Sequence, residues 1–323
     1  DCTRRIIYAT DEEKKYVATL FSLYASWVSI RKGVSNDILH ECRQILYLFF
    51  QFVGIERQDR FVVREHMLRR ISRAVAFLAV GGVGIVAAEL AILKKNTPRL
   101  PRAPGPVRGK INGKGKPLNV LIFGDSVACG VGCESNEQAL SGAVAETLRE
   151  KTKRPVVWTV LAESGYTAGD MKEKLLPKLR RRSKEQFDVV IISVGVNAVL
   201  SGHSPTQYKD ELTSMLCELR EIVGYRTSIV CMGMPPMASF PQISYLKPLN
   251  AIVGLYAGWI NQASHAACKI TNTAVCMDIL IPGDGESNPE KYMAPDGFHP
   301  NFLACKFICE ENKMVGVALE ELQ

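Results

Sequence analysis

A serine and a histidine with an acid close by, the residues that build an activated nucleophile, lie near opposite ends of residues 118–323. Ser126 follows Gly124-Asp125 directly after an apolar run, and His299 stands three residues after Asp296 in a Gly- and Pro-containing loop. A serine hydroxyl needs a base to remove its proton, and a carboxylate orients the histidine that serves as that base. The pattern predicts acyl transfer, with Ser126 as nucleophile, His299 as base and Asp296 as its partner.

Two further positions carry groups that can stabilise negative charge. Gly165 offers a backbone N–H with no side chain in front of it, and Asn197 offers an amide in the sequence Gly-Val-Asn. Taken singly, each of these signals also fits an ordinary turn. Together they predict an oxyanion hole formed by the N–H groups of Ser126 and Gly165 and the amide of Asn197.

The elements that must position these groups alternate between short apolar runs and longer stretches with helical spacing. Val- and Ile-rich runs predict five strands, at residues 118–123, 156–160, 188–194, 228–232 and 274–279. The stretches between them, such as 137–150, 168–181 and 205–222, predict helices. This alternation favours a parallel sheet covered on both faces, whose reactive groups gather at the carboxyl ends of the strands.

The same blocks resemble those of the SGNH hydrolases, also called the GDSL esterase/lipase family. They occur in the family's order as Gly124-Asp125-Ser126, Gly165, Gly195-Val196-Asn197 and Asp296-Gly297-Phe298-His299. The resemblance covers residues 118–323 and implies a three-layer α/β/α sandwich with a five-stranded parallel, flavodoxin-like sheet. It implies the catalytic and oxyanion-hole roles given above, and no cofactor or metal is expected.

Other segments are similar to one bacterial-type subgroup of these esterases, namely Gly130-Val131-Gly132, Ser164-Gly165-Tyr166-Thr167-Ala168, Met234-Pro235-Pro236-Met237, Phe240-Pro241 and Thr97-Pro98-Arg99-Leu100-Pro101. One position departs from the family pattern. The third block commonly reads Gly-x-Asn-Asp, and here its last residue is Ala198. We expect the absent carboxylate to loosen the loop that aims Asn197, and therefore a slower enzyme and not an inactive one.

The predicted function is that of a serine esterase acting on carboxylic esters with short to medium acyl groups, because no long apolar insertion marks a lid. Tyr166, Met234 and Phe298 are the candidate substrate contacts, and they fit the core beneath the site equally well. Two alternatives stay open. One is a catalytically weakened SGNH-like binding protein, which Ala198 favours. The other is a membrane-associated interaction protein that works through residues 1–93. The expected partner is a small-molecule or lipid-like ester.

The chain before residue 118 has a different composition. Residues 94–117 hold eight basic and no acidic residues, with five prolines and four glycines, which predicts an extended basic linker. Residues 1–93 predict a helical segment. Within it, residues 74–93 carry Glu89 as the single charge, and twenty apolar residues are about the length of a membrane span. The alternative is a buried helical hairpin. We expect membrane attachment through 74–93 with a cytosol-facing catalytic domain, or else a cytoplasmic protein.

Charge and cysteine content exclude other classes of function. The net charge of +7 is concentrated in the linker, since residues 118–323 hold 19 basic and 23 acidic residues. The basic stretch contains no aromatic residue, so nucleic-acid binding is not expected. Ten cysteines without a C-x-x-C pair indicate reduced thiols. The pairs Cys129/Cys133 and Cys305/Cys309 lack the second pair that a metal site usually has.

Overall fold

The computed structural model describes residues 82, 84–93, 95–182, 185–280, 282, 288–311 and 313–322. The chain divides into two units, residues 1–83 and residues 84–323. All but one of the described residues belong to the second unit, and the following account concerns that unit alone.

A six-stranded sheet forms the centre of this unit, in the order β1-β3-β2-β4-β5-β6. Its strands are β1 (Arg108–Ile111), β2 (Leu118–Gly124), β3 (Val156–Ala162), β4 (Val189–Ser193), β5 (Ser228–Met232) and β6 (Val275–Met277). The five predicted strands are confirmed, and neighbouring pairs among them are parallel. β1 is an additional strand within the stretch predicted as linker, and it pairs antiparallel with β3 at the edge.

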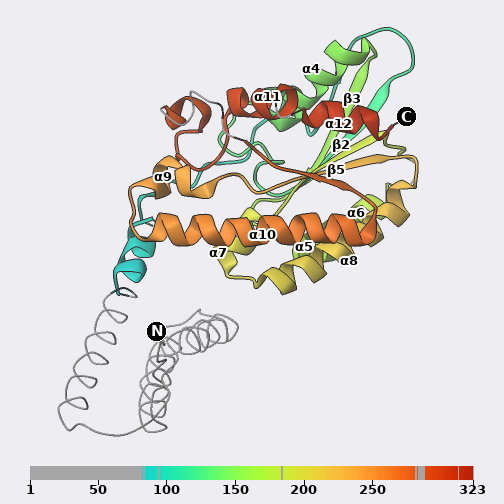
Figure 1. Ribbon diagram of the computed structural model, residues 1–323. Helices are drawn as coiled ribbons and strands as arrows, with labels where there is room; N and C mark the ends of the chain where they lie inside the picture. The colour runs from blue at the N-terminus through green and yellow to red at the C-terminus, as the bar shows by residue number, and fades with distance from the viewer. Residues whose placement is uncertain are drawn as a thin grey trace, which may run out of the picture. The chain divides into compact units, whose positions relative to one another are not determined.

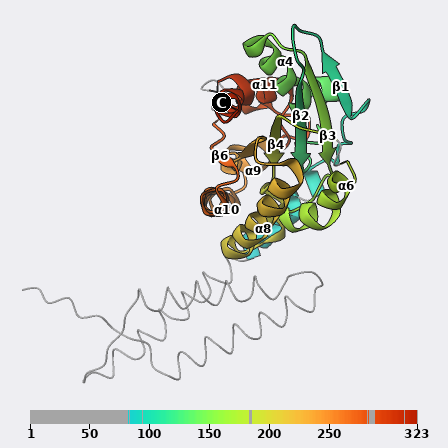
Figure 2. The same cartoon turned by 90° about the vertical axis from the view of Figure 1, so that its right-hand side faces the viewer.

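Helices cover both faces of the sheet, which confirms the three-layer architecture (Figures 1 and 2). One layer holds α4 (Leu140–Thr152), α11 (Phe302–Glu310) and α12 (Met314–Glu320). The other holds α5 (Ala168–Asp170), the π-helical turn η2 (Met171–Leu175), α6 (Leu176–Arg180), α7 (Val196–Ser201), α8 (Pro205–Val223) and α10 (Leu249–Thr271). Each layer packs its own apolar cluster against the sheet, so the central strands are buried on both sides and read as continuous apolar runs.

The helix α8 illustrates how the local sequence sets these elements. Ser204 caps its start by accepting a hydrogen bond from the N–H of Gln207, and Pro205 occupies the first turn, where its missing N–H costs nothing. Buried residues, beginning with Tyr208 and Leu212, recur at helical spacing along one side. Gly224 ends the helix with a positive φ of 87°. The apolar stripe fixes which side of α8 faces the sheet.

The predicted linker is extended, and part of it is hydrogen-bonded to the loop that follows β2. The carbonyl of Pro101 accepts from the N–H of Gly132 at 3.2 Å, and the N–H of Ala103 donates to the carbonyl of Cys129 at 3.1 Å. A side chain on Gly130 would lie 2.9 Å from the Ala103 methyl group, so the glycine permits this close approach. The stretch therefore packs against the loop that follows Ser126.

The predicted membrane segment 74–93 falls partly outside the described residues, as do residues 1–73 of the predicted helical segment. Residues 84–93 are helical. Glu89 is buried, and its Oε2 accepts a hydrogen bond of 2.9 Å from the N–H of Leu249 at the start of α10. Across the described part of the chain, no helix combines the length and apolar character that crossing a bilayer requires.

Candidate active site

Ser126 stands in a tight turn directly after the central strand β2. Gly124 ends that strand so close to β4 that a Cβ atom would lie 2.2 Å from the carbonyl oxygen of Ser193. The N–H of Asp125 donates to the same carbonyl at 3.1 Å, and the N–H of Val131 donates to the carbonyl of Ser126 at 3.0 Å. These bonds fix the turn and hold Ser126 at the carboxyl edge of the sheet.

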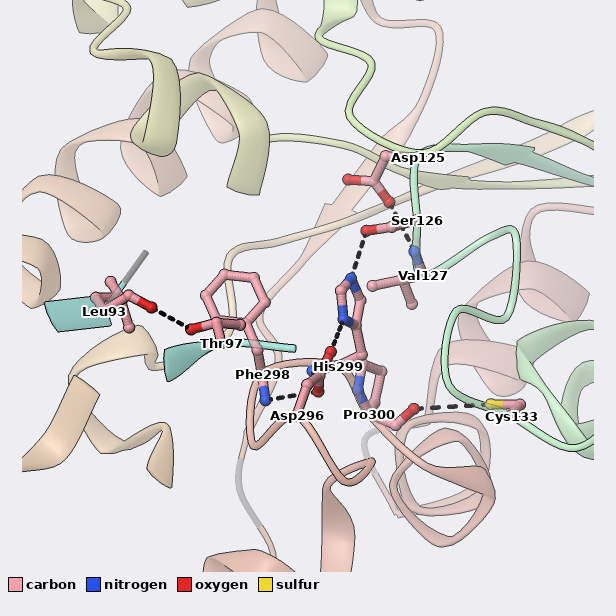
Figure 3. Close-up of polar contacts among 10 residues, drawn as sticks. All are labelled: Leu93, Thr97, Asp125, Ser126, Val127, Cys133, Asp296, Phe298, His299 and Pro300. Atoms are coloured by element: carbon pink, nitrogen blue, oxygen red, sulfur yellow. Dashed lines mark hydrogen bonds and ion pairs between the residues drawn. The ribbon is translucent and has the colours of Figure 1, made fainter. Parts of the chain in front are cut away.

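The loop before α11 brings His299 to Ser126, although 173 residues separate them in sequence. His299 Nε2 lies 2.9 Å from Ser126 Oγ, and His299 Nδ1 lies 2.6 Å from Asp296 Oδ2 (Figure 3). Gly297 forms the turn between Asp296 and His299 with a φ of 62°, a conformation that favours glycine. The three side chains therefore form one continuous hydrogen-bonded chain.

The charge state of Asp296 follows from its surroundings. Burial raises the pKa of this carboxyl group, but hydrogen bonds outweigh burial and leave the pKa lowered. They come from the His299 ring and from the N–H groups of Phe298 and His299, which both donate to Oδ1 at 3.0 Å. An ionised Asp296 holds the proton on Nδ1 of His299, so that Nε2 is left to accept the Ser126 proton.

The candidate oxyanion donors Gly165 and Asn197 are linked through Tyr166, the residue after Gly165, whose carbonyl accepts from Asn197. Gly195 begins α7 with a φ of 125°, and Asn197 follows two residues later. The side-chain amide of Asn197 donates to the carbonyl of Tyr166 at 3.0 Å and lies 3.5 Å from Asp125 Oδ2. Gly165 has a φ of 84°, and its Cβ position faces open space. A small anionic group could therefore approach the Gly165 backbone without a steric block.

The departure at Ala198 leaves Asn197 with other means of support. Ala198 is fully buried within the apolar layer of α7. The two acceptors that hold the Asn197 amide, Tyr166 O and Asp125 Oδ2, both lie outside the third sequence block. The Asn197 amide therefore has two acceptors that do not require a carboxylate at position 198.

Asp125 is a polar residue whose contacts at the site were not foreseen from the sequence. Its side chain is buried, and Oδ1 accepts from Ser193 Oγ at 2.8 Å and from the N–H of Val127 at 3.1 Å. Burial raises the pKa of Asp125 to about 6, against the opposing effect of these hydrogen bonds. The position of Asp125 in the Gly-Asp-Ser block was the one feature of the sequence that placed it near Ser126. The bonding to Ser193 could not be foreseen, because that residue lies 68 positions away.

We expect the Asp125→Asn substitution to change how stability depends on pH. The folded protein holds the Asp125 proton up to about pH 6, whereas the ordinary pKa is 3.8. The contribution of Asp125 to the free energy of unfolding is therefore greatest below pH 4. About 3 kcal/mol of this contribution is lost as the pH rises to 6 and above. Asparagine cannot ionise, so the urea midpoint of this variant should show less of that decline between pH 4 and 7.

The same variant should also lower ester turnover, by about tenfold, because its amide group would oppose the Asn197 amide where Oδ2 now accepts. Asp278→Asn is the matched control, since the Asp278 carboxylate is exposed and is bonded to Asn261 and His265, outside the hydrogen-bonded chain of Ser126, His299 and Asp296. An Asp125→Asn protein whose pH dependence matched that of the unmodified chain would show that Asp125 does not titrate in this range.

An apolar pocket of about 100 Å³ adjoins Ser126 and His299. Side chains from several elements line it, among them Met232, Phe240, Ile279, Phe298, Phe307 and Ile308. Of the three predicted substrate contacts, Phe298 lines this pocket and the other two do not. Met234 is buried, with its sulfur beside Gly195, and the Tyr166 ring lies under the Lys174 ammonium group at 5.0 Å. The side chains of Met234 and Tyr166 thus pack next to the site and do not line the pocket.

One group among the described residues has metal-ligating character, and it was not foreseen. Sulfur atoms of Cys231, Cys268 and Cys276, from β5, α10 and β6, lie within 4.8 Å of one another. Three sulfur atoms leave a tetrahedral zinc ion one ligand short. His265, one helical turn before Cys268, is already bonded through Nε2 to Asp278 at 2.9 Å. The cluster shares no residue with the Ser126–His299–Asp296 arrangement.

Comparison with known proteins gives one family. The model of the GDSL-like lipase/acylhydrolase family matches residues 122–303, which include Ser126, Gly165, Asn197, Asp296 and His299. No curated protein matched the sequence.

Similar solved structures include a psychrotrophic esterase from Pseudoalteromonas sp., with 19% identity over 62% of this chain and 98% of that one, at a TM-score of 0.46. A lipase from a goat rumen metagenome is 18% identical over 62% and 98%, at a TM-score of 0.47. An acetylxylan esterase from Geobacillus stearothermophilus is 16% identical over 64% and 94%, at a TM-score of 0.42.

Proposed function

Because the chain belongs to the GDSL-like lipase/acylhydrolase family and is a carboxylic ester hydrolase, we propose that Ser126, His299 and Asp296 are the residues that perform this hydrolysis. The observation that supports the assignment is the hydrogen-bonded chain, with 2.9 Å from Ser126 Oγ to His299 Nε2 and 2.6 Å from His299 Nδ1 to Asp296. Both distances are those of a nucleophile bonded to its base and a base bonded to the group that orients it.

Acylation of Ser126 is the first half of the reaction. His299 Nε2 takes the proton of Ser126 Oγ as this oxygen attacks the ester carbonyl carbon. Negative charge then develops on the carbonyl oxygen, which receives hydrogen bonds from the N–H groups of Ser126 and Gly165 and from the Asn197 amide. Each such donor contributes about 3 kcal/mol to stabilising the transition state. Asp296 stabilises the imidazolium ion, which gives its proton to the departing alcohol.

Water completes the cycle by attacking the acyl-enzyme. His299 removes a proton from this water, and the carboxylic acid leaves as Ser126 regains its hydrogen. During this half-reaction Asn197 must exchange its long 3.5 Å contact with Asp125 for a contact with the oxyanion, while its bond to Tyr166 holds the amide in place. The amide thus moves little between the free and the reacting states.

The apolar pocket beside Ser126 supports an ester with a short to medium acyl group as the substrate. Its volume of about 100 Å³ is small, and its lining is dominated by Met, Phe, Ile and Pro side chains. The lining has few polar groups apart from the catalytic ones, so recognition would depend on shape and apolar contact.

Reaction with a fluorophosphonate probe tests the assignment. Such probes modify a serine that a working base has activated, so we expect one adduct, mapped to Ser126 by mass spectrometry. The Ser126→Ala variant should remain unlabelled. Absence of an adduct in the folded protein would contradict the assignment. It would favour instead a catalytically weakened binding protein, for which the Ala198 departure is the supporting observation.

A further inference from the structure

The helix at residues 84–93 exposes only apolar side chains. Val86, Glu89 and Leu93 are the less exposed residues, spaced as one helical face. The remaining exposed residues are Gly84, Ile85, Ala87, Ala88, Leu90, Ala91 and Ile92. A helix surrounded by water on that side would be expected to carry charged or polar residues there.

The first half of α10 shows the same property. Ile252, Leu255 and Trp259 recur at spacings of three and four residues, and all three are exposed. Together with Ile85, Leu90 and Ile92 they form a set that we call the end patch, whose six side chains are 42–59% exposed. The hydrogen bond from Leu249 to Glu89 joins the two helices, and the 84–93 helix lies at the start of α10 in Figure 1.

Glu89 does not interrupt the end patch. Its carboxylate is turned to the N–H of Leu249 and is buried, so the one acidic residue of the sequence 74–93 is absent from the exposed side. The carboxylate also lies at the start of α10, where the helix dipole favours a negative charge. A carboxylate that appeared in the sequence to oppose an apolar environment thus has a hydrogen-bond donor within the fold.

The charged residues nearest to the end patch in the sequence, Glu89 apart, are positive. Lys95, which is also helical, and Arg99 are exposed and follow residues 84–93, and Lys247 is exposed just before α10. In the sequence, no Asp or Glu occurs between residues 90 and 124 or between residues 222 and 277. An apolar surface that includes Trp259, with cations and the exposed Tyr245 near it in the sequence, has the composition of surfaces that bind anionic lipid headgroups.

The end patch is connected to the catalytic loop through α9 (Pro241–Ser244), which leads into α10. The N–H of Gln242 in α9 lies 3.4 Å from the carbonyl of Gly297. The Phe298 ring packs edge-on against Phe240, with centroids 5.3 Å apart. A surface bound at the start of α10 would therefore lie close to the loop that carries Asp296 and His299.

We propose that the end patch docks on an anionic lipid bilayer and that the substrate is an ester whose apolar part resides in that bilayer, an inference whose substrate half rests on the proposed function. A second copy of this chain fits less well, because the same cations would meet across a two-fold contact. Residues 1–72 also fit less well, since they hold 12 basic and nine acidic residues and so carry a net positive charge themselves.

Binding of the full chain to vesicles tests the docking half without reference to activity. The vesicles are phosphatidylcholine with or without one third phosphatidylglycerol. We expect stronger binding to the anionic vesicles, and at least about tenfold weaker partitioning for Leu255→Gln/Trp259→Gln. The matched control is Tyr225→Gln/Ile270→Gln, which replaces two exposed apolar residues outside the end patch and should bind as the unmodified chain does.

The fluorescence of Trp259 reports which surface meets the lipid. The chain has three tryptophans, of which Trp158 is buried and Trp27 is replaced in a W27F background. Brominated lipids should then quench Trp259 upon binding. Vesicle binding without this quenching, and without loss in the α10 double variant, would place attachment elsewhere and overturn the proposal. Absence of binding, combined with self-association that the double variant abolishes, would assign the patch to a second copy and also overturn it.

The substrate half is tested by comparing a vesicle-embedded ester with a water-soluble butyrate ester. We expect the ratio of the two turnover rates to fall at least about tenfold in the α10 double variant and to be unchanged in the control pair. An unchanged ratio in both would contradict the inference. Failure of the proposed function looks different, because neither ester would be hydrolysed while vesicle binding and quenching would still be observed.

Discussion

Replacement of Ser126 by alanine is expected to lower kcat for ester hydrolysis by about 10⁵-fold, because the acyl group then has no oxygen to which it can transfer. The residual rate would come from the oxyanion donors, which still act on water as the attacking group. Steady-state hydrolysis of a soluble p-nitrophenyl ester, measured at saturating substrate, gives the comparison. The acyl-enzyme burst should disappear together with turnover.

The matched control for this variant is Ser239→Ala. Ser239 lines the same apolar pocket but does not take part in the hydrogen-bonded chain of Ser126, His299 and Asp296. Its hydroxyl group is exposed, so the alanine variant should fold normally and keep its turnover within a few fold. If Ser126→Ala hydrolysed esters as fast as the unmodified enzyme, Ser126 could not be the nucleophile.

Replacement of His299 by glutamine is expected to lower kcat by about 10⁵-fold as well, because Ser126 then keeps its proton at the moment of attack. The reaction rate with a fluorophosphonate should fall along with turnover, since both depend on the activated serine. Combining His299→Gln with Ser126→Ala should add little further loss, because the two residues act as one unit.

The chain offers a second histidine–aspartate pair as the control for that experiment. His265 Nε2 lies 2.9 Å from Asp278 on the exposed side of α10, a contact like that of His299 with Asp296. His265→Gln should therefore leave ester turnover intact. An equal loss in both histidine variants would point to a general effect on folding, and a normal rate for His299→Gln would remove it from the reaction.

Much of the fold was predictable because the sheet is parallel and buried on both faces. Runs such as Val189–Ser193 contain apolar residues at every position but one, which few elements other than a central strand require. β1 was not predictable in this way. Its sequence Arg-Gly-Lys-Ile has no such run, and the strand exists because it pairs with the free edge of β3. β1 is therefore a strand because of its pairing with β3, and not because its own residues favour the extended conformation.

The candidate site likewise has parts that the sequence could predict and parts that it could not. Ser126, Gly165, Asn197 and His299 were each identified from their place at a strand end or in the last loop, and the fold brings those places to one edge of the sheet. Tyr166 and Met234 were expected to line a substrate wall, and neither lines the apolar pocket. An apolar residue near a motif indicates burial, but the sequence does not tell which cavity it faces.

The long separation between Ser126 and His299 has a consequence for the timing of activity during synthesis. The ribosome completes Ser126 well before His299, and at ordinary rates of translation the 173 intervening residues take about 10 to 35 s to make. Throughout that interval the nascent chain carries Ser126 without the residue that we propose as its base. If His299 is the base, as we propose, a polypeptide that ends before residue 299 would have no esterase activity, and no partly synthesised chain would be an active enzyme.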